Sequence, residues 1–94
     1  MAGAAIVTSS STGHGGFPPT VALVGNPKFL VFGKPINCTG DSWAPHSAPN
    51  TPPHAGTSIG SSKFLVFGKP AAMIGDSLTC GDTIATGEPK FNIS

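Results

Sequence analysis

The chain has 94 residues, of which only 10% are charged, and its formal net charge at neutral pH is +1. A chain of this length forms one domain at most, so we expect a single domain over residues 1–94, with a core that is marginal without further stabilisation. The five basic residues are all lysine and form no cluster, which argues against a nucleic-acid-binding protein. Thirteen glycines and ten prolines indicate many loops, while the 38% hydrophobic content argues against disorder.

The N-terminal segment, residues 1–13 ("MAGAAIVTSSSTG"), has neither the cationic start nor the continuous apolar stretch of a secretory signal peptide. No window of the sequence approaches the ~18–20 apolar residues of a membrane-spanning helix. We therefore expect a protein that is made in the cytoplasm without a signal peptide. If it leaves the cell, a route other than general secretion must carry it.

Loop segments rich in Gly, Pro, Ser and Thr separate the apolar runs, and no segment has the sustained periodicity of a helix. The loops contain every histidine and one of the two cysteines: residues 9–20 contain His14, residues 44–58 contain His46 and His54, and residues 80–89 contain Cys80. The sequence therefore predicts an all-β domain whose polar ligand-type side chains lie in loops.

The octapeptide "KFLVFGKP" occurs at residues 28–35 and again at 63–70, which divides the chain into halves of approximately 9–46 and 47–87. In each copy a run of β-forming residues is followed by Gly-Lys-Pro. This pattern predicts a hairpin in which Gly33-Lys34 forms the turn and Pro35 begins the return strand. We expect the two hairpins to pack against each other across a pseudo-twofold axis, and their second apolar face to meet loops or a partner protein.

A Gly-Asp-Ser sequence follows each hairpin, at residues 40–42 and 75–77. Aspartate side chains often accept hydrogen bonds from nearby backbone in turns. Asp41 and Asp76 are therefore predicted to stabilise turns by accepting hydrogen bonds from their own downstream backbone.

The repeat also relates the four ligand-type side chains. Each half contains a histidine, a hairpin, a Gly-Asp-Ser turn and then one more ligand, so His14 and His46 of the first half correspond to His54 and Cys80 of the second. Zinc accepts mixed imidazole and thiolate ligands in tetrahedral structural sites, and such a site contributes to the folding free energy of a small domain. We predict a zinc site formed by these four residues, with Phe17 and Trp43 covering the metal and the small core.

Cys38 aligns with Met73 inside the second repeat, so it is interpreted as a buried apolar thiol. A Cys38–Cys80 disulfide is an alternative, although it would remove the thiolate from the zinc site. No catalytic arrangement of acids, serines and histidines is evident, and the chain is predicted not to be an enzyme. The alternative function is a small zinc-dependent metalloenzyme or binding domain with an open coordination position.

The residues just described resemble a known family. The stretch "GKPAAMIGDS" (68–77), its degenerate partner "GKPINCTGDS" (33–42), the three histidines and the late cysteine are together similar to the PAAR-repeat proteins. The resemblance extends from "GHGG" near residue 13 to "CGDTIATG" near residue 87. Met73 stands where the family pattern has Arg, and Ile36-Asn37-Cys38 depart from it in the first copy.

The resemblance implies a small cone of short β-strands with zinc near its tip, held by His14, His46, His54 and Cys80. The base of such a cone caps the blunt end of a trimeric β-helical spike, one copy per trimer. The spike would be a VgrG protein of a bacterial type VI secretion system or a phage tail spike. The implied role is mechanical: the tip sharpens a spike that punctures an envelope, contacts the target membrane only transiently, and can carry effector proteins.

Overall fold

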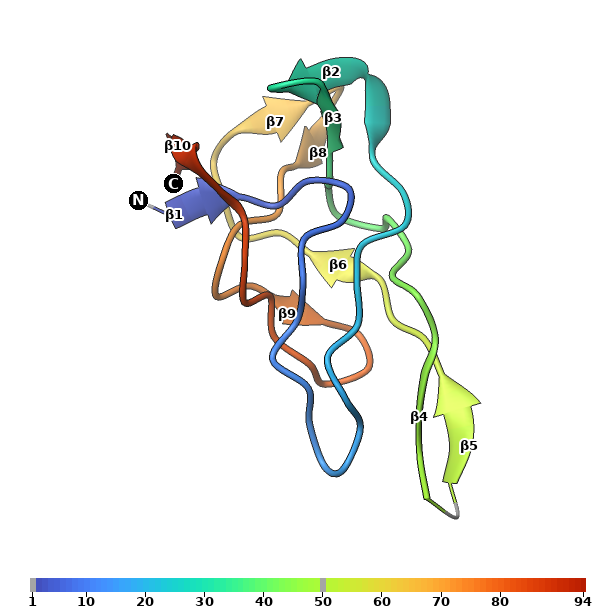
Figure 1. Cartoon of the computed structure of the whole chain (residues 1–94). Helices are drawn as coiled ribbons and strands as arrows, with labels where there is room; N and C mark the ends of the chain where they lie inside the picture. The colour runs from blue at the N-terminus through green and yellow to red at the C-terminus, as the bar shows by residue number, and fades with distance from the viewer. Residues whose placement is uncertain (1, 50) are drawn as a thin grey trace.

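The computed structural model describes residues 2–49 and 51–94, which form short strands and loops and contain no helix (Figure 1). The molecule is elongated, with principal extents of 38 × 22 × 21 Å. The predicted all-β, loop-rich fold is therefore confirmed. Within the described residues, no helix is long and apolar enough to cross a membrane.

The strands pair in five antiparallel two-stranded sheets: β1 with β10, β2 with β3, β4 with β5, β6 with β9, and β7 with β8. Their bounds are β1 (Ala2–Ala4), β2 (Asn26–Val31), β3 (Lys34–Ile36), β4 (His46–Ala48), β5 (Thr51–His54), β6 (Ser58–Ile59), β7 (Leu65–Val66), β8 (Lys69–Pro70), β9 (Ser77–Leu78) and β10 (Glu88–Ile93).

The two copies of the octapeptide form the hairpins β2–β3 and β7–β8, as predicted, but their turns lie one residue earlier than predicted. Val31 pairs with Lys34, so the two turn residues are Phe32 and Gly33, and Lys34 already belongs to β3. Both turn residues have positive φ, at 49° for Phe32 and 85° for Gly33. A two-residue turn with positive φ at both positions matches the right-handed twist of the strands it joins. Phe32 and Gly33 adopt this conformation, so the turn forms at these two residues.

A third hairpin-like unit is formed by the two ends of the chain. Residues 88–93 ("EPKFNI") have the same order of buried and exposed side chains as residues 26–31 ("NPKFLV"). In place of the return strand of a hairpin, Ala2 from the opposite end of the chain pairs with Ile93. The chain therefore has one more repeat than the octapeptide indicates.

Closed rings of backbone hydrogen bonds join the three units. The amide of Ala5 donates to the Ala72 carbonyl, that of Ala72 to Asn37, and that of Asn37 to Ala5, each at 2.9 Å. A second set of three equivalent bonds runs the opposite way around the three units, between neighbouring residues: Val7 donates to Pro35, Thr39 to Pro70, and Ile74 to Gly3. The arrangement is pseudo-threefold, and this corrects the pseudo-twofold axis expected from two copies, because the third copy is divided between the chain ends.

Each unit has a turn that a polar side chain stabilises. Asp41 accepts a hydrogen bond from the amide of Cys38 (2.8 Å), and Asp76 accepts one from Met73 (3.0 Å). Both bonds run to backbone three residues upstream, not downstream as predicted. In the third unit the hydroxyl oxygen of Ser9 takes the same place and accepts from the Ile6 amide at 3.0 Å.

The core is divided between two clusters. The larger one lies among the three units, which we call the base: Ala4, Ile6, Val31, Ile36, Cys38, Val66, Ala71 and Ile93, with Phe29, Phe64, Met73 and Phe91 packed against them. The rings of Phe29, Phe64 and Phe91 contact one another with centroids 5.5–6.2 Å apart. The smaller cluster surrounds the fully buried Trp43 and extends towards Cys80.

Candidate metal centre

The end of the molecule that carries the histidines, which we call the tip, comprises the turn at 14–17, the β4–β5 pair and the turn at 79–82. His46 and His54 face each other across β4 and β5. The buried His46 ring contacts the Pro18 carbonyl through Nδ1 at 2.7 Å. Because a carbonyl only accepts, His46 Nδ1 carries the proton and its Nε2 is free to bind a metal. That Nε2 lies 2.6 Å from His54 Nε2.

His14 begins a tight turn closed by reciprocal backbone hydrogen bonds with Phe17. Gly15 and Gly16 occupy the two central positions with φ of 47° and 87°, a conformation that glycine adopts without strain. The turn places His14 Nε2 3.2 Å from His54 Nε2. It also stacks the Phe17 ring on His54, with centroids 3.9 Å apart and planes 18° apart. Phe17 therefore covers the imidazoles, as the sequence predicted.

Cys80 approaches the histidines from the turn after β9. A side chain at Gly56 would lie 2.9 Å from Cys80 Sγ and 3.1 Å from its amide nitrogen, so only glycine permits this approach. The nitrogen and sulfur ligand atoms of His14, His46, His54 and Cys80 all lie within 4.8 Å of one another. The structure thus brings together the four residues that the sequence proposed as ligands.

This donor set fits a metal ion. Ligand atoms placed tetrahedrally at zinc distances are about 3.3–3.6 Å apart. The His14–His54 Nε2 separation of 3.2 Å is close to this range, and the His46–His54 separation of 2.6 Å is shorter. Two imidazoles at such separations also disfavour protonation, since each cation repels the next. Burial, together with the neighbouring His46 and His14, lowers the pKa of His54 below its ordinary value of 6.5, while Asp82 opposes this shift. His54 can therefore present a neutral nitrogen near neutral pH, and the four residues together could hold a metal ion.

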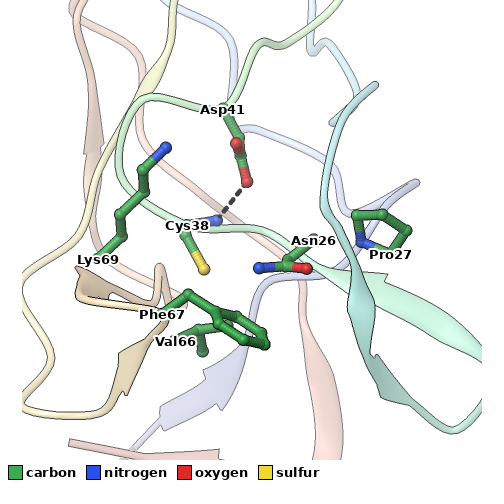
Figure 2. Close-up of a pocket in the computed structure, with 7 residues that line it drawn as sticks. All are labelled: Asn26, Pro27, Cys38, Asp41, Val66, Phe67 and Lys69. Carbon is green, nitrogen blue, oxygen red and sulfur yellow. Dashed lines mark hydrogen bonds between the residues drawn. The ribbon is translucent and has the colours of Figure 1, made fainter.

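The other cysteine lies in a different environment. Cys38 is buried beside a pocket of about 290 Å³ in the base, lined also by Asp41, Val66, Phe67 and Lys69 among others (Figure 2). Burial, followed by the charge of Asp41, raises the pKa of the Cys38 thiol to about 11. The thiol is thus protonated at neutral pH and is a poor ligand or nucleophile. Both cysteines are free, which agrees with the interpretation of Cys38 as a core residue and not with a disulfide.

The outer surface of the base carries exposed apolar side chains at repeat-equivalent positions: Leu30 and Phe32 on one hairpin, Leu65 and Phe67 on the other. Phe32 and Phe67 are 68% and 71% exposed. They also hold positive φ, near 50°, which is strained for a bulky residue and suits Asn or Gly. Such a residue lowers the stability of the free protein in two ways, through its strained backbone and through the exposure of its ring to water. This combination is typical of a residue that contacts a partner protein.

Three short β-units around a pseudo-threefold axis define a small repeat protein, and the cluster of three histidines and a cysteine beyond them could hold a metal ion. The family model of the PAAR motif matches residues 8–86, and the chain therefore belongs to the PAAR motif family. Proteins of this family are structural components of spike tips, associated with type VI secretion or phage tails, rather than enzymes. No curated protein matches the sequence.

Proposed function

We propose that this chain is a non-enzymatic tip protein that caps the blunt end of a trimeric β-helical spike, one copy per trimer. The spike would be a VgrG-type protein or a phage tail spike. The observation that carries this proposal is the pseudo-threefold base, with three equivalent units closed by rings of backbone hydrogen bonds. A single chain with this symmetry can offer similar backbone surfaces to all three chains of a trimer.

The apolar hairpin tips supply the contact surface in this proposal. Phe32 and Phe67 extend from β2–β3 and β7–β8, which lie together at the end of the molecule opposite the β4–β5 pair (Figure 1). Burying exposed aromatic rings at an interface gives large contact area with little loss of side-chain entropy. The strain and exposure that these residues impose on the free protein would be offset on the spike.

We further propose that the metal is zinc and that His14, His46, His54 and Cys80 are its ligands. Three imidazoles and one thiolate complete a tetrahedral shell, which is typical of structural zinc. A closed shell leaves no position for a substrate. The metal would stiffen the tip, where the described backbone has only one short strand pair and tight turns, as a part that is driven through an envelope requires.

The proposal is tested by mixing the protein with the β-helical spike domain of a VgrG-type protein from the organism that encodes this chain. Light scattering after gel filtration should give one copy per trimer, with about one zinc per cap. The variant Phe32→Asn/Phe67→Asn retains the turns and should lose binding by at least tenfold while keeping its metal. A complex with three caps per trimer, or unchanged binding by this variant, would contradict the proposed interface.

A further inference from the structure

Asp82 is a buried carboxylate next to the candidate metal centre, and its two oxygens differ in their hydrogen bonding. It is 1% exposed, and its Oδ1 accepts hydrogen bonds from the Thr12 hydroxyl (3.0 Å) and the Thr83 amide (2.7 Å). Its Oδ2 accepts no hydrogen bond of good geometry among the described residues. Burial raises the pKa of this carboxyl, but the Ser11 hydroxyl, the Gly13 amide and the two groups just named lower it overall. The side chain is therefore a buried carboxylate anion, which positive charge nearby would stabilise.

Asp82 joins the two segments that carry His14 and Cys80. Thr12 lies two residues before His14, and Asp82 lies two residues after Cys80. The side-chain hydrogen bond between Thr12 and Asp82 therefore links the two segments that carry these ligands. The amide of Thr12 also donates to the Thr83 carbonyl at 2.9 Å. These bonds fix the spacing of the two segments.

The chain between the carboxylate and Cys80 also contacts the site. Gly81 lies against the His14 ring, where an added Cβ would be 3.9 Å from Nδ1. The negative charge of Asp82 acts on His54, where it raises the pKa against the larger lowering effects of burial and of the other two imidazoles. The carboxylate is therefore close enough to the site for its charge to act on His54.

The charges of the site explain why a carboxylate is useful there. A divalent metal bound by three neutral imidazoles and one thiolate has a net charge of +1. A buried carboxylate of charge −1 neutralises that centre, and such an interaction is stronger inside a protein than in water. Side chains around the ligands of metal sites commonly act in this way.

We propose that Asp82 is a positioning residue of the metal centre, which holds His14 and Cys80 at their mutual distance and supplies the compensating negative charge. This inference rests on the proposed four-ligand site. Asp82 does not bind the metal itself. Its effect is transmitted through the Thr12 hydrogen bond and through its charge.

The test compares Asp82→Asn with Asp76→Asn in the full chain. Both changes neutralise a buried aspartate, but Asp76 is fully hydrogen-bonded in the Gly-Asp-Ser turn, through Ser61 and Met73. Competition with a chelator measures the dissociation constant for zinc, and thermal melting of the chelated protein measures the stability without metal. We expect Asp82→Asn to weaken zinc binding by about 10- to 100-fold, and Asp76→Asn to weaken it less than threefold at a comparable loss of metal-free stability.

Cobalt substitution supplies a readout that a general loss of stability does not change. The absorption bands of Co²⁺ bound by nitrogen and thiolate report the geometry of its ligands, so Asp82→Asn should shift or weaken them and Asp76→Asn should leave them unchanged. Equal effects of the two variants on zinc affinity, or an unchanged cobalt spectrum in Asp82→Asn, would overturn the proposal.

Thr12→Val keeps the test decisive if Asp82→Asn does not fold. Thr12 is exposed, so its loss should not unfold the chain, yet one donor to Asp82 disappears. We expect it to weaken zinc binding by about three- to tenfold, and an unchanged affinity would count against the positioning role. If the parent protein itself binds no metal, the proposed metal centre fails, whereas normal binding by the parent and by both Asp82→Asn and Thr12→Val rejects only this inference.

Discussion

At the base, three copies of one β-unit surround an apolar core, and two sets of backbone bonds between units are repeated around the axis. At the tip, four side chains from separate segments meet at one point, with one aromatic ring covering them. The stability of the base is thus distributed over many small contacts, whereas that of the tip depends on a few ligands and the ion they can hold. A small chain can in this way build a broad contact surface and a narrow, stiff end from one short sequence.

Metal removal should have the largest effect and should act on the tip. A metal present at a thousand times its dissociation constant stabilises the folded state by about 4 kcal/mol. For a domain of this size, that corresponds to a fall of roughly 15–30 °C in melting temperature after chelation. Cys80→Ala should reproduce the loss of metal and of stability. An unchanged melting temperature in both experiments would show that the tip does not depend on a metal.

A cavity in the base should destabilise the protein without affecting metal content. Ile36 is fully buried among the three units, so Ile36→Ala should lower the free energy of unfolding by about 2–5 kcal/mol. Denaturant titration measures this loss, and elemental analysis should still find one metal per folded chain. Loss of metal in this variant would mean that the two ends are not independent.

Acid should weaken the tip before the base, because protons compete with the metal for its ligands. We expect metal affinity to fall by about tenfold per pH unit below neutrality. In the metal-free protein, the lowered pKa of His54 adds a smaller effect, since the unfolded chain binds a proton more readily than the folded one. This destabilisation is absent well above pH 6.5 and grows as the pH falls below that value, because only the unfolded chain then takes up the proton. His54→Gln should remove this part of the pH dependence in chemical unfolding.

The hairpin turns should show the smallest effect on stability. Asn adopts positive φ more readily than Phe, and the Phe67 ring is 71% exposed, so Phe67→Asn should change the free energy of unfolding by less than about 0.5 kcal/mol or increase it slightly. Thermal melting tests this directly. A large destabilisation would assign the ring to the fold of the base and not to contact with a partner.

The sequence was sufficient to predict the two hairpins, the all-β fold and the four ligand-type residues, because the octapeptide aligned them. It did not reveal the third unit, in which "PKF" at 89–91 and "GAAI" at 3–6 are the remaining traces of the repeat. The unit also begins at one end of the chain and ends at the other, so no local window contains it. The environment of Asp82 was equally hidden, since its partner Thr12 comes close only after folding.

The pairing of β1 with β10 has a consequence for biosynthesis. Strand β1 is synthesised well before its partner β10, because the two strands lie far apart in the sequence. The pairing of β1 with β10, which completes the third unit, therefore waits until residues 88–93 have been made, and contacts between such distant segments form slowly. Until β10 arrives, the apolar side chains of β1 and of the two hairpins remain open to other proteins, so we expect the yield of soluble protein to depend on how quickly the ends meet.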